Sequence, residues 1–143
     1  MQASHNRKLK IGILTFHRAL NNGAVLQCFA LQEAIKKLGH EVISEHVTNP
    51  LTPVGDGLSP KELFDRESKL IANADCMVAD VTLPSWGTAF LMEHALSVGK
   101  PVLALFYKEA ATPLPFMIAG HPDLYVAHYS KGNVRTVLKK NMD

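Results

Sequence analysis

Short apolar runs alternate with longer amphipathic runs along most of this 143-residue chain. Periodicity and turn residues predict strands at 9–15, 41–47, 76–81, 101–107 and 124–128, separated by helices at 24–38, 60–73, 88–98 and 131–141. Strand–helix alternation of this kind is typical of parallel sheets, because a crossover between parallel strands needs a helix-length connection. The sequence therefore predicts an α/β fold of three layers, in which helices cover both faces of a five-stranded parallel sheet.

Local signals indicate where several of these helices begin and end. Gly39 and Gly99 follow two of the predicted helices, in the position where a left-handed backbone ends a helix. Ser59 precedes Pro60 and stands three residues before Glu62. This is the pattern of a capping box with a proline in the first helical position, so we expect a helix to begin at residue 60.

Composition narrows the class of protein. The chain is long enough to bury a core, and we expect a single α/β domain over residues 9–143 after a disordered lead-in at 1–8. The net charge is +2 and the basic clusters lie at the two ends, so nothing argues for nucleic acid as a partner. No apolar run is long enough to span a membrane, and the polar start is not a signal peptide. We therefore expect a cytoplasmic protein without a membrane partner.

The reactive residue types also exclude some kinds of site. Cys28 and Cys76 lie in apolar segments and form no C-x-x-C pair, which favours two buried free thiols. The seven histidines do not follow the spacing of metal ligands. The glycine-rich motifs that bind nucleoside triphosphates or dinucleotides do not occur. We expect neither a metal nor a cofactor.

Residues 74–93 hold the strongest candidate for a binding site. The strand at 76–81 leads into a polar turn with Pro84, Ser85 and Gly87, and a helix is predicted to open near Thr88. Ligands of open α/β sheets bind at the carboxyl ends of the strands, and N–H groups at a helix start can hold an anion. The turn is therefore a candidate phosphate site; the alternative is an ordinary connection between a strand and a helix.

A set of motifs runs in order from about residue 42 to residue 139. They are EHV at 45–47, LSPKELFDRE at 58–67, ADCMVADVTLPSWG at 74–87, GKPVLALF at 99–106, MIAG at 117–120 and YS at 129–130. With these motifs the segment resembles the nucleoside 2-deoxyribosyltransferase superfamily, and within it the 2′-deoxynucleoside 5′-phosphate N-hydrolase branch. The resemblance implies a flavodoxin-like (Rossmann-like) sheet, a homodimer, a nucleotide or nucleoside ligand, and cleavage of the N-glycosidic bond of a deoxynucleotide.

The resemblance also implies two catalytic carboxylates. In that family a glutamate on the helix after the turn attacks the anomeric carbon, and an aspartate on the preceding helix assists it. The assisting position is Glu67 in this chain, whereas the nucleophile position, four residues after Gly87, is Leu91. Glu93 follows two residues later, about 200° further around an ideal helix, and is the candidate nucleophile if the helix shifts its register. The alternative for Glu67 and Glu93 is a surface position on a helix.

Binding residues follow from the same resemblance. It implies that Ser85 and Gly87 hold the 5′-phosphate and that His46 and Met117 lie at the pocket, although His46 is equally compatible with a structural role. The serine that a neighbouring subunit offers to the phosphate aligns with Pro115, and the tyrosine expected on the first strand is missing.

Two further candidates come from their positions in the predicted sheet. Arg18 follows the first strand and Asp80 lies near the end of the third, so both are expected at the carboxyl edge where ligands bind. There Arg18 could contact a phosphate.

Residues 8–42 carry a different resemblance. The strand, the NNGAVLQ turn at 21–27 and the following helix resemble the opening of polysaccharide pyruvyl transferases. Two resemblances that meet near residue 42 predict a recombined or designed chain, in which one β-α unit has replaced another. The sequence thus leaves two hypotheses: an N-glycosidase that hydrolyses a deoxynucleoside 5′-monophosphate, and a catalytically silent α/β domain with at most weak anion binding.

Overall fold

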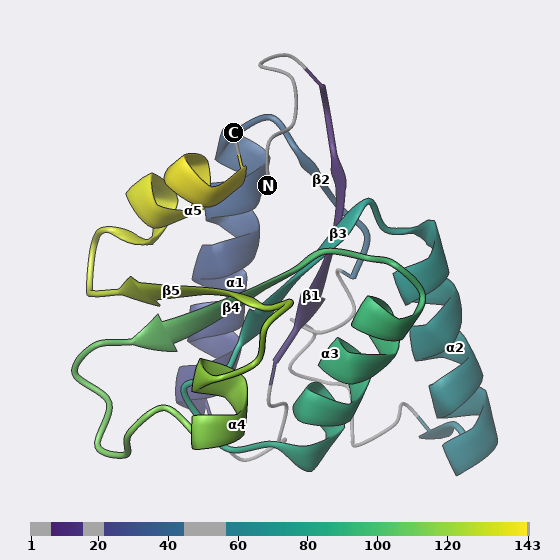
Figure 1. Cartoon of the computed structure of the whole chain (residues 1–143). Coiled ribbons are helices and arrows are strands. Elements are labelled where there is room, and N and C mark those ends of the chain that lie inside the picture. The colour runs from purple at the N-terminus through teal and green to yellow at the C-terminus, as the bar shows by residue number, and fades with distance from the viewer. Residues whose placement is uncertain (1–6, 16–21, 45–56, 143) are drawn as a thin grey trace.

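The computed structural model describes residues 7–15, 22–44 and 57–142, with the side chains of 22–27 excepted. It contains a five-stranded parallel sheet in the order β2-β1-β3-β4-β5 (Figure 1). The strands are β1 (Lys10–Leu14), β2 (Glu41–Val42), β3 (Cys76–Asp80), β4 (Val102–Tyr107) and β5 (Tyr125–Tyr129). The helices are α1 (Asn22–Lys37), α2 (Pro60–Asn73), α3 (Trp86–Ser97), α4 (Phe116–Ala119) and α5 (Val134–Met142). The predicted α/β architecture is confirmed.

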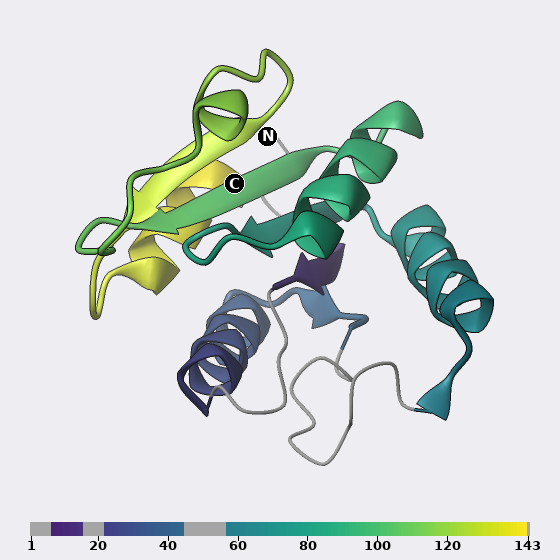
Figure 2. The same ribbon diagram turned by 90° about the horizontal axis from the view of Figure 1, so that it is seen from below.

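Helices lie on both faces of the sheet, and Figure 2 shows α1 and α3 on opposite sides of it. One core cluster joins the sheet to α1 and α5, and a second joins it to α2 and α3. Strand β3 is buried on both faces, since Met77, Val78 and Ala79 are all inaccessible to solvent. Alternate side chains of a strand point to opposite faces, so Val78 packs in the first cluster and Met77 in the second. A continuous apolar run is what such a central parallel strand requires.

The helix-end signals are confirmed in the structure. The Ser59 hydroxyl accepts a hydrogen bond from the Glu62 amide at 3.2 Å, and the Ser59 amide donates to the Glu62 carboxylate at 2.8 Å. This capping box begins α2 at Pro60. Gly39 and Gly99 have φ angles of 88° and 78°, the left-handed conformation expected after a helix.

Several predicted boundaries were wrong by a few residues. Helix α3 begins at Trp86, two residues before Thr88, because Ser85 is its N-cap. Helix α5 begins at Val134 instead of 131, because Gly132 has a φ angle of 89° and residues 131–133 form a turn. The four-residue helix α4 was not predicted. The second strand ends at Val42 in the structure, and 45–47 lie outside the described residues.

Both cysteines are buried free thiols, as predicted. Burial raises the pKa of Cys28 to about 12 and that of Cys76 to about 11, and nearby carboxylates add to both shifts. Within the part of the chain that the structure describes, no helix is long and apolar enough to cross a membrane. The same residues contain no cluster of three or more side chains placed to bind a metal ion.

Candidate functional site

The turn between β3 and α3 is held by hydrogen bonds at both of its ends. At its start, the Val81 amide donates to the Leu105 carbonyl at 2.9 Å and the Thr82 amide donates to the Asp80 carboxylate at 2.9 Å. At its end, the Ser85 hydroxyl caps α3 by accepting from the Thr88 amide at 3.2 Å. The first amides of a helix have no partner within the helix, so the start of α3 directs N–H groups out of the carboxyl edge of the sheet.

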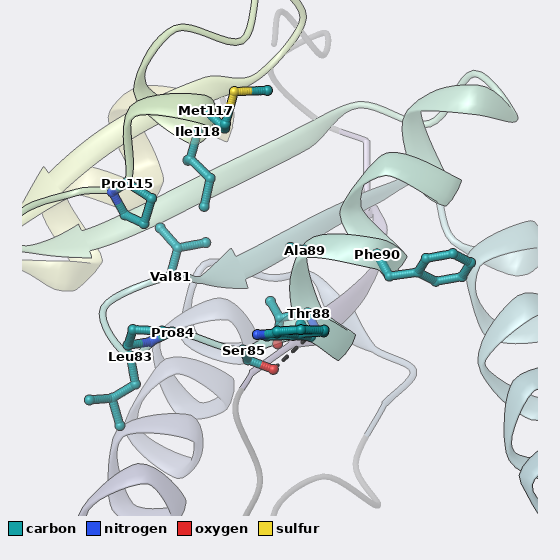
Figure 3. A pocket seen from close by; sticks show the side chains of 11 residues that line it. Val81, Leu83, Pro84, Ser85, Thr88, Ala89, Phe90, Pro115, Met117 and Ile118 are labelled. Carbon is teal, nitrogen blue, oxygen red and sulfur yellow. Dashed lines mark hydrogen bonds between the residues drawn. The ribbon is translucent and has the colours of Figure 1, made fainter.

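A hollow of about 490 Å³ lies beside this turn. Figure 3 shows the turn and the start of α3 on one side of it and the α4 segment on the other. It is lined by Val81, Leu83, Pro84, Ser85, Trp86, Thr88, Ala89, Phe90, Pro115, Met117 and Ile118. None of these residues carries a charge, and the polar side-chain groups among them are the hydroxyls of Ser85 and Thr88 and the indole N–H of Trp86. An apolar wall with a few polar groups is typical of small-molecule sites.

Gly87 leaves open space beside the turn, although its backbone conformation does not require a glycine. A Cβ atom built on Gly87 would have the Ser85 hydroxyl, at 3.9 Å, as its nearest neighbour. Its φ angle lies outside the left-handed region, so another residue could adopt this conformation. The glycine therefore keeps the surface near the α3 amides open, which is what the close approach of an anion to a backbone needs.

Of the residues predicted from the resemblance, Ser85 and Met117 line the hollow and Gly87 lies beside it. Met117 belongs to α4 and is largely exposed. His46 and Arg18 lie outside the described residues.

The structure does not place the two predicted catalytic carboxylates in the lining of the hollow. The Glu93 side chain is 68% exposed and accepts a hydrogen bond from Nε2 of His121 at 3.2 Å. The Asp123 amide donates to Nδ1 of the same ring, so in a neutral ring the proton is on Nε2. Glu67 lies on α2 with its side chain only 13% exposed, in an ion pair of 3.1 Å with Arg66.

The orientation of α3 explains this separation. Phe90 and His94 contact the ring of Phe64 on α2, with centroids 6.3 and 6.0 Å apart, so their side of α3 faces α2. Leu91 packs against the core cluster beneath α2 and α3. Glu93, about 200° further around the helix, is on the side of the segment that follows α4, where it meets His121.

Asp80 lies at the carboxyl edge of the sheet, as predicted, but both of its carboxylate oxygens have partners within the chain. Oδ1 accepts from the Thr82 amide and Oδ2 accepts from the Tyr129 hydroxyl at 2.8 Å. Burial raises the pKa of Tyr129, and the Asp80 charge raises it further.

Sequence reasoning left the exposed aromatic side chains near the hollow out of the candidate site. Trp86 is 95% exposed and Phe116 is 90% exposed, and Phe90 is more than half exposed. A signal was present in the sequence, because α3 has apolar residues on all of its sides whereas a surface helix normally has one apolar stripe. Phe116 comes to this place through the fold, and no local pattern predicted the four-residue helix α4 to which it belongs.

Curated relatives share about a third of their residues with the matched part of this chain. A Thermofilum pendens protein with the provisional name 2′-deoxynucleoside 5′-phosphate N-hydrolase 1 is 37% identical over 90 residues, or 63% of each protein. The 5-hydroxymethyl-dUMP N-hydrolase of Danio rerio is 31% identical over 116 residues, which are 76% of this chain and 81% of the relative. The chain thus spans less than two thirds of the T. pendens protein and more of the D. rerio protein.

Solved structures of low sequence identity share the fold. The CMP N-glycosidase of Clostridium botulinum matches with a TM-score of 0.62 at 18% identity, over 93% of this chain and 97% of that one. A 2-deoxyribosyltransferase of Bacillus psychrosaccharolyticus matches with a TM-score of 0.64 at 21% identity, over 84% and 85% of the two chains. No protein-family model matches the chain. Relatives that are 31–32% identical and that this chain covers to more than two thirds nevertheless show that it belongs to the 2′-deoxynucleoside 5′-phosphate N-hydrolase family.

Proposed function

We propose that the chain binds a deoxynucleoside 5′-monophosphate at the carboxyl edge of the sheet and hydrolyses its N-glycosidic bond, which releases the base and deoxyribose 5-phosphate. One observation carries the proposal. This member of the family has an open turn, from Ser85 to Gly87, at the start of the twelve-residue helix α3, and a hollow lies beside that turn. The phosphate is assigned to the α3 amides and the Ser85 hydroxyl, because a helix N-terminus favours an anion. The base is assigned to the apolar hollow.

The reaction needs a carboxylate near the anomeric carbon, because the transition state resembles an oxocarbenium ion. Within this proposal Glu93 is the nucleophile and Glu67 assists it. Glu93 has to leave His121 in order to reach the substrate. An exposed pair of this kind contributes little stability, so its separation is a small barrier.

Release of free base, measured by chromatography, tests the hydrolytic proposal. The substrates are the four common deoxynucleoside monophosphates and 5-hydroxymethyl-dUMP, with the wild type compared to Glu93→Gln and Glu67→Gln. We expect release by the wild type and a loss of at least about a hundredfold in each variant, since each removes a charge and keeps the shape. The absence of base release from all five substrates would contradict hydrolysis.

A second candidate function is a silent binding domain, and Leu91 favours it. This residue occupies the position of the family nucleophile and packs against the core. A silent domain would be stabilised thermally by deoxynucleoside monophosphates without releasing base. Leu91→Glu then becomes the informative variant, because base release that appears only in this variant would show that the site lost one carboxylate and little else. A wild type that releases base would exclude the silent domain.

We also propose a homodimer that buries the outer side of α3 and the α4 segment. Trp86, Phe90 and Phe116 form the exposed part of this surface, and aromatic side chains bury roughly 150–250 Å² each, or roughly 450–750 Å² together. Met117 adds to this area, which then approaches the roughly 800 Å² per partner of a standard interface. Light scattering should give twice the chain mass for the wild type and the chain mass for Trp86→Ser/Phe116→Ser. A monomeric wild type at micromolar concentration would contradict the dimer.

A further proposal concerns the origin of residues 8–42. Strand β1 lies between β2 and β3, and α1 is the next element along the chain. A β-α unit from another parallel-sheet protein could therefore replace β1 and α1 without changing the layers. We infer a recombined chain from the two resemblances that meet near residue 42. Separate sequence comparisons of 1–42 and 43–143 test this, and a single family found with both segments would contradict it.

A further inference from the structure

A chain of hydrogen bonds ties together the carboxyl ends of β3, β4 and β5. The Asp80 carboxylate accepts from the Thr82 amide and from the Tyr129 hydroxyl, at 2.9 and 2.8 Å. The Thr82 hydroxyl in turn accepts from the Tyr107 amide at 3.0 Å. The rings of Tyr107 and Tyr129 pack against each other, with centroids 5.4 Å apart. Three neighbouring strands are thereby joined by side chains at the edge where a ligand would bind.

This network is partly buried, and its polar groups are satisfied within it. Thr82 and Tyr129 are both buried, and Asp80 is half-buried between them. A carboxylate with two strong donors has little reason to move, because a hydrogen bond to a charged group is costly to break away from water. Asp80 therefore fixes the direction in which the chain leaves β3.

The network also holds the start of the turn between β3 and α3 in place. The bond from the Thr82 amide to Asp80 closes a tight turn of the Asx type immediately after β3. Ser85, the N-cap of α3, follows only three residues later. A change in the position of Thr82 thus passes along a short stretch of chain to the Ser85 hydroxyl and the α3 amides.

We propose that Asp80 and Tyr129 are positioning residues, which aim the Ser85 turn at an anion without contacting the ligand themselves. The inference rests on the anion-binding part of the proposed function, and it does not require hydrolysis. Tyr129 lies away from the hollow and acts on the turn through the two side chains that its hydroxyl meets, Asp80 and Thr82. Removing this hydroxyl should therefore loosen the turn while the ring still fills its place in the core.

The experiment compares Tyr129→Phe with Tyr125→Phe, a matched control on the same strand whose side chain is half exposed. Dissociation constants are measured for inorganic phosphate and for a deoxynucleoside monophosphate. We expect Tyr129→Phe to weaken both ligands by the same factor, about tenfold, since displacement of a binding group by part of an ångström has effects of this order. Tyr125→Phe should leave both constants unchanged.

Asp80→Asn distinguishes positioning from direct contact. The amide oxygen can still accept from the Thr82 amide, so a positioning role predicts that this variant keeps most of the affinity. If Asp80 instead contacted the sugar, Asp80→Asn would weaken the deoxynucleotide and leave inorganic phosphate unaffected. That result would overturn the inference.

Amide chemical shifts of residues 85–88 give a readout that does not depend on ligand. In Tyr129→Phe these shifts should move, and in Tyr125→Phe they should not. A wild type that binds both ligands but releases no base would contradict hydrolysis and leave the positioning role standing, whereas a wild type that binds neither ligand would contradict the anion site and the positioning role with it. Unmoved shifts together with unchanged dissociation constants would contradict the positioning role alone.

Discussion

Helices α2 and α3 cover the same face of the sheet, yet their outer surfaces are different. Helix α2 buries Leu70 and Ile71 and directs charged residues such as Lys61 and Asp65 to solvent, where they form a salt bridge. Helix α3 buries Met92 and Ala95 and exposes Trp86 on its outside. The first pattern is that of a helix whose work is to hold the sheet. The second leaves apolar surface uncovered, which marks α3 as the helix that serves a ligand or a partner.

Two glycines show the same contrast at a smaller scale. A Cβ atom on Gly12 of β1 would lie 2.5–2.8 Å from side-chain atoms of Met77 and Leu70, so a larger residue here would force these buried side chains to shift. A Cβ atom on Gly87 would meet nothing closer than 3.9 Å. Gly12 therefore allows close packing in the core, and Gly87 keeps the surface beside the turn open.

The largest expected effect on stability comes from a buried residue of α2, compared with an exposed residue of α3. Ile71→Ala should lower the free energy of unfolding by about 2–5 kcal/mol, because it leaves a cavity in a site without solvent access. Trp86→Ala should change it by less than about 0.5 kcal/mol, since the side chain is almost fully exposed. Urea unfolding at a concentration where the protein is monomeric measures both. A Trp86→Ala effect as large as that of Ile71→Ala would break the comparison.

The glycines give the next effect. Gly12→Ala should cost about 1–3 kcal/mol of stability, because the added methyl group overpacks a buried contact. Gly87→Ala should instead raise stability by up to about 1 kcal/mol, because alanine is the better helix former. The same Gly87→Ala protein should bind inorganic phosphate more weakly. Loss of stability in Gly87→Ala would show that this glycine is structural after all.

Alkaline pH should lower the free energy of unfolding through the two cysteines, which are buried on the face of the sheet opposite to α2 and α3. The pKa of Cys28 is raised from 9.0 to about 12 and that of Cys76 to about 11. As pH rises through 9, the thiols of the unfolded chain lose their protons before those of the folded chain. The contribution of the two thiols to the free energy of unfolding is therefore fully present below pH 9 and falls above it, until the folded thiols titrate as well. The slope is about 1.4 kcal/mol per pH unit for each group. Urea midpoints between pH 8 and 10 should fall less steeply in Cys28→Ala, and an equal slope would contradict burial of the thiol.

The smallest expected effect compares the two N-caps. Ser59→Ala and Ser85→Ala should each lower stability by about 1 kcal/mol, because each leaves an amide of its helix without a capping oxygen. Only Ser85→Ala should also weaken phosphate binding. Equal binding by the two variants would remove Ser85 from the proposed site.

The sequence contained most of the fold, because strands and helix caps are local patterns. The apolar run of β3 and the Ser59 cap both predicted what the structure has. The carboxylates could not be placed in this way, because the position of Glu93 depends on which side of α3 meets a segment 28 residues further along the chain. The hydrogen bond from Tyr129 to Asp80 was not predicted for the same reason, since the two residues are 49 positions apart.

The strand order has a consequence for how the chain folds. Strand β1 pairs with β3 from Ile11 to Leu14, and its first amide already binds Asp75, 65 positions away. During synthesis β1 therefore emerges long before β3, its neighbour on that side. Contacts of this separation slow folding, because the intervening chain loses entropy before the strands gain by pairing. Until then the unpaired edge of β1 exposes an apolar strand to association with other chains, which makes a chaperone more valuable to this protein than its size implies.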